Sequence, residues 1–386
     1  MKTDQDHRLL YFSPSWSGGL ADYAHEQCQA LGRLEVKVTL LTAPGYVVKD
    51  SRSYETRRTL RPIWPASLRL YRKLIYIFVV LQNHFHLAKV IRQGHFRYVL
   101  AGSFAEYLSP LWVRPLRRLA HDGVVFGAVV HDPVRDYEVG PRWWHRWSVA
   151  AAYSYLREVF VHEAIELDTV RPVPELQASI VPHGPYRFPH AKRTPAQVRA
   201  DLKIPSNAKI LLSFGHVRDG KNLDLVIRAV ASEPQVYLVI AGKVSSNTQK
   251  PIEHYQAIAH EVGVAARCCW LTNYIPANQV GDLFEACDAV LLTYSSSFRS
   301  ASGVLNAAVS FRRPCIASSG MGNLRSMVLR YGLGVFVEPD KCEAIRNGIR
   351  RLLEGIPEPS WAKYACDNTW DKNARIVRNR MWSPSA

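Results

Sequence analysis

The sequence has 386 residues, of which 47% are hydrophobic and 21% are charged, and its net charge is +16. This composition excludes a disordered chain, and the length is ample for two domains. The seven cysteines form no C-x-x-C pair, which argues against a zinc site or a disulfide framework and favours a reducing, cytoplasmic compartment.

The first half of the chain predicts a parallel sheet. Its N-terminal residues lack the apolar core of a secretory signal. We expect strands at 8–13, 36–41, 98–100, 124–130, 159–161 and 180–181. A glycine turn at 15–19 and a helical pattern at 20–31 separate the first two strands, the order found in βαβ units.

Residues 51–120 are strongly basic, with thirteen Lys and Arg against two acids. Their apolar run, 74–81, is far shorter than the roughly 20 residues that span a bilayer, but suits the interface of an anionic membrane. The candidate interface residues are Trp64, Arg69, Arg72, Lys73, Arg114, Arg117 and Arg118. The run 142–147 supplies further aromatic and basic anchors. A solvated basic face over a buried helix is the alternative; no recognised nucleic-acid module supports a nucleic-acid partner.

The second half repeats the pattern after a proline-rich linker at 182–195. We expect strands at 210–214, 236–241, 289–292 and 315–317, and a last helix at 361–382. The predicted domains are therefore 1–188 and 189–371, with a C-terminal helix at about 372–386 packing back on the first domain. Both domains are α/β, with doubly wound, Rossmann-like parallel sheets.

Two segments of the second domain predict an anion site. Residues 214–222 (FGHVRDGKN) follow a strand and place Arg218 and Lys221 at a glycine turn before a helix. Residues 302–304 begin another helix and offer the free amides of Ser302, Gly303 and Val304. Cations and free amides together suit a diphosphate, because phosphate oxygens favour charge-assisted donors. A surface pair of cations and an ordinary helix cap are the alternatives.

Two turns of the first domain also follow predicted strands. Gly18 and Gly19 allow the backbone to approach a substrate or the donor diphosphate closely, although a plain turn has the same pattern. His131 and Asp132 follow the strand at 124–130. Asp132 is a candidate general base if the reaction inverts configuration, and Asp22 is a second. A structural histidine, and an acid placed against the helix dipole, are the alternatives for His131 and Asp22.

Seven motifs in one order resemble the nucleotide-sugar glycosyltransferases of GT-B fold, most closely glycosyltransferase family 4. They are SGGLADY at 17–23, VPHG at 181–184, FGHVRDGKN at 214–222, NYIP at 273–276, LFEACDAVLLTY at 283–294, SGVLNAAVSFRRPCIAS at 302–318 and GLGVFVEPD at 332–340. The resemblance covers nearly the whole chain and implies two Rossmann-like domains that face a central cleft.

The resemblance also implies roles for single residues. His131 would contact the donor sugar, and Arg218 with Lys221 would hold the donor diphosphate. Gly215, Tyr274, Ile275 and Asn306 would meet the nucleoside. The family commonly has two Glu around the donor loop, whereas this sequence has Phe298 and Asn306 there. This departure leaves the donor sugar and the retention of configuration open.

The resemblance implies that neither a cofactor nor a metal is needed. The one Asp-x-Asp match, at Asp4 and Asp6, lies near the N-terminus. We expect a peripheral enzyme of the cytosolic membrane face that moves a hexose from a nucleotide diphosphate sugar to a polyprenyl-diphosphate-linked saccharide, in exopolysaccharide or O-antigen synthesis. A transferase with a soluble acceptor, a sugar-nucleotide epimerase and a non-catalytic scaffold are the alternatives.

Overall fold

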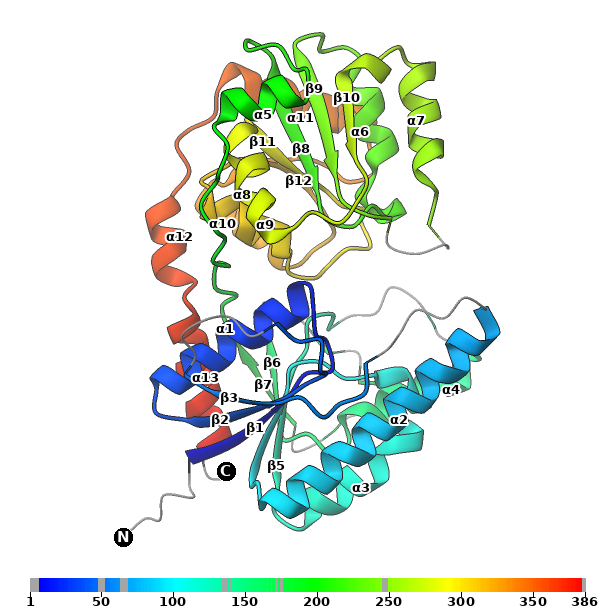
Figure 1. Cartoon of the computed structure of the whole chain (residues 1–386), viewed down its shortest axis with the longest axis vertical. Helices are drawn as coiled ribbons and strands as arrows, with labels where there is room; N and C mark the ends of the chain where they lie inside the picture. Colours follow the sequence, from blue (N-terminus) through cyan, green and yellow to red (C-terminus); the bar gives the residue numbers. More distant parts are fainter. Residues whose placement is uncertain are drawn as a thin grey trace. The chain divides into compact units, whose positions relative to one another are not determined.

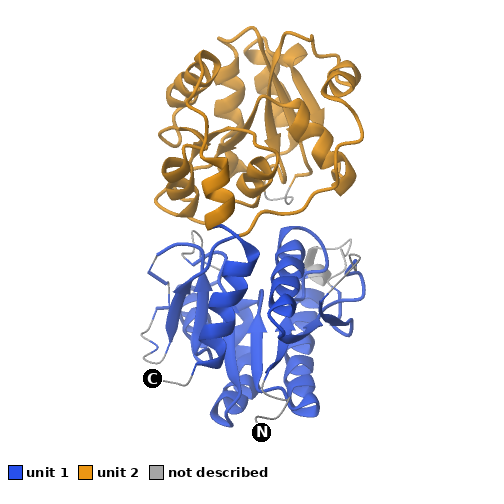
Figure 2. Ribbon diagram, turned by 90° about the vertical axis from the view of Figure 1, so that its left-hand side faces the viewer, with its two compact units in different colours: residues 1–183, 368–386 blue, residues 184–367 orange. Residues whose placement is uncertain are grey.

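The computed structural model divides the chain into two compact units (Figure 2). Unit 1 comprises Met1–His183 and Asn368–Ala386, and unit 2 comprises Gly184–Asp367. The units therefore divide a few residues before each of the predicted boundaries. The structure describes residues 7–47, 53–62, 69–133, 138, 140–164, 166–167, 169–170, 173, 176–244 and 249–383, with only the backbone of 69–72.

Unit 1 is built on a parallel sheet of seven strands in the order β3-β2-β1-β4-β5-β6-β7 (Figure 1). The strands are β1 (Arg8–Phe12), β2 (Lys37–Leu41), β3 (Glu55–Arg57), β4 (Tyr98–Ala101), β5 (Val125–Val129), β6 (Glu158–Val161) and β7 (Gln177–Ile180). β3 was not expected, because its sequence, ETR, has no apolar residue. It forms at the edge of the sheet through pairing with β2, and its composition does not predict this pairing.

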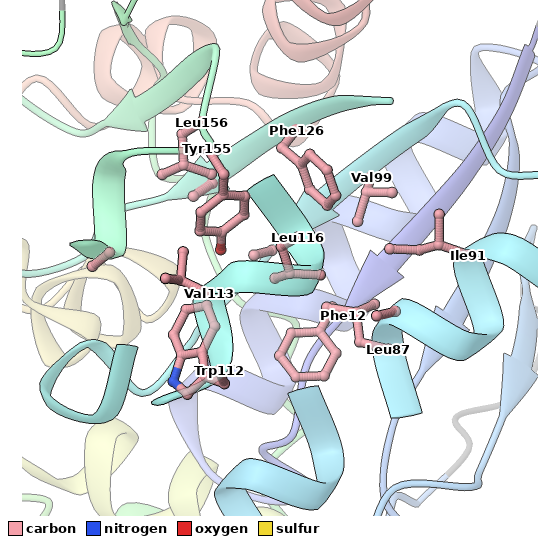
Figure 3. Packing of buried hydrophobic residues seen from close by; sticks show 14 of the residues in the cluster. Phe12, Leu87, Ile91, Val99, Trp112, Val113, Leu116, Phe126, Tyr155 and Leu156 are labelled. Carbon is pink, nitrogen blue, oxygen red and sulfur yellow. The ribbon is translucent and has the colours of Figure 1, made fainter. Parts of the chain in front are cut away.

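Helices cover both faces of this sheet. They are α1 (Gly19–Arg33), α2 (Arg69–Gly94), α3 (Ser109–His121), α4 (Arg142–Tyr153) and α13 (Trp370–Trp382). Figure 1 shows α1 and α13 on one face and α2, α3 and α4 on the other. α3 packs against both α2 and α4, and its buried Trp112 lies in the core that Figure 3 shows. The doubly wound architecture predicted for the first domain is confirmed.

The helix α2 is longer than the apolar run at 74–81 suggested. Within its segment Lys73–Gly94, an 18-residue window has a mean hydropathy of 1.5, and by length and composition alone the segment could cross a membrane. However, 44% of that 18-residue window is buried, and Val80, Leu87 and Ile91 belong to the core of unit 1. Exposed apolar side chains are concentrated in its first half, where Leu74, Ile75, Tyr76 and Phe78 lie.

The helix predicted at 361–382 is two helices, which corrects the prediction. α12 (Trp361–Asp367) belongs to unit 2 and α13 to unit 1. The break occurs because the Thr369 hydroxyl accepts the Lys372 backbone N–H, an N-cap that starts a new helix. α13 then packs along α1, where Asn373 bonds to Gln27, Tyr23 and the Pro182 carbonyl.

Unit 2 has a parallel sheet of six strands in the order β10-β9-β8-β11-β12-β13. The strands are β8 (Lys209–Phe214), β9 (Val236–Ala241), β10 (Cys268–Leu271), β11 (Ala289–Thr293), β12 (Cys315–Ser318) and β13 (Gly334–Phe336). The helices are α5 (Pro195–Asp201), α6 (Leu223–Val230), α7 (Ile252–Glu261), α8 (Ala277–Ala286), α9 (Gly303–Ser310), α10 (Asn323–Tyr331), α11 (Cys342–Glu354) and α12. One apolar cluster covers each face of this sheet, as a doubly wound fold requires.

Candidate functional site

The turn after β8 forms the floor of the candidate site in unit 2. Gly215 has a φ of 83° and its N–H donates to the Ala241 carbonyl at 2.9 Å. A Cβ on Gly242 would lie 2.2 Å from the Gly215 carbonyl oxygen, so only glycine allows the ends of β8 and β9 to approach this closely. The turn ends at Asn222, which is left-handed with a φ of 53° and precedes α6.

Lys221 is buried in this turn, with 9% of its surface exposed. Its Nζ donates to the Phe214 carbonyl at 2.5 Å, and no carboxylate of the described residues pairs with it. Burial and then the charge of Arg218 lower the pKa of Lys221 to about 7. A buried ammonium without a counter-ion is costly, so an anion that bound here would relieve that cost.

Arg218 is held by aromatic rings. Its guanidinium lies 5.5 Å from the ring centres of both Tyr294 and Phe298, which stack on each other at 4.1 Å. Such cation–π contacts fix the position of the guanidinium without neutralising its charge. Within the described part of the chain, no carboxylate pairs with Arg218.

The start of α9 lies beside these two cations. The Ser302 hydroxyl accepts the Leu305 N–H at 3.3 Å and lies 3.1 Å from the Tyr294 hydroxyl. A Cβ built on Gly215 would lie 3.6 Å from both Lys221 Nζ and Val304 Cγ2. The structure therefore brings the predicted residues Arg218, Lys221 and 302–304 together around Gly215, which had been assigned to the nucleoside.

Two more basic residues join this cluster and were missed from the sequence. His216 follows Gly215, and burial, followed by the charges of Lys221, Arg218 and Lys243, lowers the pKa of the His216 imidazole. Lys243 is exposed and follows Gly242 at the end of β9. Its position after a strand and a glycine is the same signal that identified the turn after β8.

Asp340 joins the two loops of the site and was also missed. Its carboxylate accepts Asn222 Nδ2 and the Ser296 N–H, each at 2.9 Å. The Ser295 N–H meanwhile donates to the Gly220 carbonyl at 2.9 Å. Desolvation raises the pKa of the Asp340 carboxyl, but the hydrogen bonds from Ser296 and Asn222 outweigh it and hold that pKa below its usual range. Asp340 thus connects the turn at 214–222 to the loop that carries Phe298.

The residues assigned to the nucleoside differ in burial and in their place in unit 2. Tyr274 is exposed and Ile275 half-buried, and both follow β10, two strands from β8. Asn306 is only 2% exposed. Its Oδ1 accepts the Tyr364 hydroxyl at 2.7 Å and its Nδ2 donates to the Ser302 carbonyl at 3.3 Å. A ribose contact to Asn306 would require these bonds to be exchanged, and it stays a prediction.

Unit 1 places its candidate residues at the carboxyl edge of its own sheet. Gly18, with a φ of 77°, caps α1, Gly19 begins that helix, and Asp22 lies in its first turn. Asp132 is exposed next to half-buried His131, which follows β5. These assignments stay predictions.

His131 belongs to an aromatic cluster with three other residues. Its ring packs edge-on against Tyr23 at 4.7 Å, with His162 at 5.6 Å, and Tyr23 also contacts His183 at 5.2 Å. Burial, and then His183, lower the pKa of His131 to about 4. A neutral imidazole suits the orientation of a hydroxyl better than the stabilisation of positive charge.

The predicted membrane residues are described only in part. Trp64 and the side chains of Arg69 and Arg72 lie outside the described part of the chain. Lys73 on α2 and the α3 residues Arg114, Arg117 and Arg118 are exposed. Asp4 and Asp6 also lie outside that part, and the described residues contain no group of three His, Cys, Asp or Glu that could hold a metal.

Comparison with known proteins agrees with this architecture. Anabaena HepE, solved with UDP-glucose, has a TM-score of 0.63 at 13% identity, covering 97% of this chain and 95% of that one. WaaG, a glycosyltransferase involved in lipopolysaccharide biosynthesis, has a TM-score of 0.64 at 15% identity, covering 97% of this chain and 99% of that one. The chain therefore has the GT-B fold of glycosyltransferases.

Residues 196–366, which form most of unit 2 and include the cationic turn, match the family described as glycosyl transferases group 1. The D-inositol 3-phosphate glycosyltransferase of Mycobacterium leprae is 33% identical over 101 residues. This match spans 26% of the present chain and about a quarter, 23%, of that relative.

Proposed function

We propose that this protein is a glycosyltransferase that uses a nucleotide diphosphate sugar. The observation that carries the proposal is the arrangement of Lys221 and Arg218, two cations that pair with no carboxylate of the described residues, around Gly215 beside the first turn of α9. A diphosphate would neutralise both cations, and its oxygens would accept hydrogen bonds from the free amides at the start of α9. The fold and the family of residues 196–366 support the same function.

The chemistry follows from the charge of the departing group. When the glycosidic bond to the donor breaks, negative charge develops on the diphosphate, and prearranged cations stabilise it. Lys221 and Arg218 are held before the donor arrives, one by the Phe214 carbonyl and the other by two aromatic rings. We further propose that configuration is retained, with the departing phosphate taking the acceptor proton and no metal or protein nucleophile involved.

A thermal-shift series tests the donor site. Because a ligand that binds only the native state raises the melting temperature, we expect UDP, GDP or ADP to stabilise the protein. Lys221→Ala should lower the affinity for the stabilising nucleotide about 10- to 100-fold, since a charged hydrogen bond contributes about 1.5–3 kcal/mol. Lys209→Ala is the matched control, because Lys209 pairs with Asp288 away from the turn. No stabilisation by any of the three nucleotides would contradict the proposal and favour a non-catalytic scaffold.

We also propose that the acceptor is a saccharide on a polyprenyl diphosphate at the cytosolic membrane face, in glycan synthesis. The support is a surface of unit 1 that combines apolar and basic side chains. Leu74 and Phe78 of α2 and Leu111 of α3 are exposed, close in sequence to Lys73 and Arg114. Exposed apolar groups beside cations suit the interface of an anionic membrane.

Co-sedimentation with vesicles tests the membrane part. We expect the protein to bind vesicles that contain phosphatidylglycerol at physiological salt, and to bind pure phosphatidylcholine less. Phe78→Ser should weaken binding, whereas Leu329→Ser, at an exposed leucine of unit 2, should not. A protein that ignores both vesicles would favour a soluble acceptor and leave the donor site unaffected.

A further inference from the structure

A cavity of about 270 Å³ lies on α4 of unit 1, at the run 142–147 that was predicted to supply interface anchors and apart from the residues assigned to the donor and to catalysis. Its lining consists of Trp143, Arg146, Trp147, Ala150 and Val170. Four of these residues recur at the spacing of one helical face, and Val170 comes from the segment that follows β6. The volume corresponds to about nine water molecules at their share of the liquid, room for a small ligand group.

Two exposed indoles form one wall of the cavity. Trp143 is 64% exposed and Trp147 is 51% exposed, and their rings stack at 6.4 Å. Trp144 packs edge-on against Trp147 at 5.4 Å, and its own N–H donates to the Tyr107 carbonyl at 2.9 Å. The two open indoles are therefore supported by a third that is anchored to the body of unit 1. Large apolar side chains that stay exposed to water while their neighbours hold them in place indicate a binding site for a ligand or a protein interface.

Among the described residues of the lining, the polar side-chain groups all donate. Neither the indole N–H groups of Trp143 and Trp147 nor the Arg146 guanidinium has a hydrogen-bond partner among the described residues. Arg142, one turn away, is instead paired with Glu138 at 3.6 Å. Indole and guanidinium groups cannot accept hydrogen bonds, so they suit a group that only accepts. A phosphate ester has that property, whereas a neutral sugar hydroxyl needs acceptors as well.

The place of the cavity in the fold fits a substrate. α4 follows β5 and Val170 follows β6, so both lining segments come after the carboxyl ends of neighbouring strands. His131 comes after the carboxyl end of the same β5. Ligands of doubly wound sheets bind at that edge.

We propose that this cavity binds the phosphate of the acceptor's lipid carrier together with the first part of its isoprenoid chain. Arg146 and the indole N–H groups would hold phosphate oxygens, and the faces of Trp143 and Trp147 would cover the hydrocarbon. The inference rests on the proposed function and names a site for the lipid part of the acceptor. The requirement for both phosphate and chain distinguishes it from general attraction to a membrane.

Titration calorimetry on the whole chain tests this with soluble probes. Geranyl phosphate should bind, geraniol should bind at least about 10-fold more weakly, and inorganic phosphate should not bind measurably, because a charged hydrogen bond contributes about 1.5–3 kcal/mol. Dihexanoyl phosphatidylglycerol tests a bulk phospholipid as the source of the phosphate and should compete poorly. Equal binding of geraniol and geranyl phosphate, or stronger binding of the phospholipid, would overturn the proposal.

Matched variants locate the site. Arg146→Gln should remove the preference for geranyl phosphate over geraniol, whereas Arg142→Gln, on the same helix but paired with Glu138, should keep it. Trp147→Phe keeps an apolar ring without the N–H and should weaken binding less than Trp147→Ala. Unchanged binding in Arg146→Gln and Trp147→Ala would overturn the assignment. The melting-temperature response to UDP, measured on the same variants, reports the donor site separately.

Discussion

The Lys221 side chain exists in a charged and an uncharged form, and a bound donor would shift the balance between them. In the free protein, burial and Arg218 lower its pKa to about 7, so near neutral pH the amine is partly uncharged. A bound diphosphate would favour the ammonium and raise that pKa again. Binding of the proposed diphosphate would therefore be coupled to the uptake of a proton by Lys221.

The pH dependence of donor binding should show this coupling. As pH rises from 7 to 9, we expect the affinity for the nucleoside diphosphate to fall, because the free protein must take up a proton to bind. Calorimetry in buffers of different ionisation enthalpy measures the proton directly. Lys221→Arg is the control, since arginine stays charged throughout this range and should make affinity independent of pH. A native protein with constant affinity over the same range would contradict the lowered pKa.

At the scale of elements, Asp340 connects loops that are remote in sequence. It follows β13, whereas Asn222 begins α6 and Ser296 follows β11. The two hydrogen bonds restrict how the loop bearing Phe298 moves relative to the turn bearing Arg218. We infer that this carboxylate positions Arg218 through the ring of Phe298 and does not itself touch the donor.

Removal of that carboxylate should loosen the donor site. Asp340→Gly should lower affinity for the nucleoside diphosphate about 3- to 10-fold, the effect of losing about 1 kcal/mol of hydrogen bonding. Glycine is chosen because φ at this position is 60°, where alanine would add strain. Glu338→Ala removes a nearby exposed acid paired with Lys341 and should leave affinity unchanged. Equal affinities in the native protein and Asp340→Gly would exclude the positioning role.

The helix α13 depends on one buried amide. Asn373 is 0% exposed and bonds to Gln27, Tyr23 and the Pro182 carbonyl. Asn373→Ala leaves these groups unpaired and should destabilise unit 1 by about 2–4 kcal/mol. Urea unfolding followed by circular dichroism measures the loss. Asn379→Ala, at an exposed position on the same helix, is the control, and an equally small effect of both substitutions would refute the role of Asn373.

For the whole molecule, buried histidines should set the limit of stability in acid. Burial is the main cause that lowers the pKa of His84 and His131 to about 4 and that of His162 to about 3. The unfolded chain takes up these protons below about pH 6.5 and the native state does not, so stability falls from there towards about pH 4 and then levels.

Denaturant unfolding at pH 7.5 and pH 5 measures this acid dependence. We expect each of the three histidines to contribute about 1–2 kcal/mol to the loss of stability at pH 5. The rings of His84 and Trp112 stack at 4.0 Å in the native protein. His84→Phe keeps a ring at this position and should reduce the loss of stability between pH 7.5 and pH 5 by about a third. Equal stability of the native protein at both pH values would show that these histidines are not neutral in the fold.

The sequence contained enough local information for the inner strands of the two sheets and the cationic turn, because strand, glycine and helix signals lie within a few residues of one another. The strands β3, β10 and β13, which were not expected, lie at sheet edges. Arg218 and Lys221 were predicted next to Ser302. Asp340 was not, because its hydrogen bond to Asn222 joins positions 118 residues apart. The ring stack under Arg218 was missed for a similar reason, since it depends on the fold of the loop after β11.

The division of unit 1 into two stretches of chain has a consequence for synthesis. Unit 2 is one continuous segment, Gly184–Asp367, and it leaves the ribosome before α13 exists. Domains generally fold as units as they emerge, so unit 2 can complete its folding while the first sheet still lacks the helix that carries Asn373. Until α13 is made, unit 1 exposes the α1 face that α13 later covers.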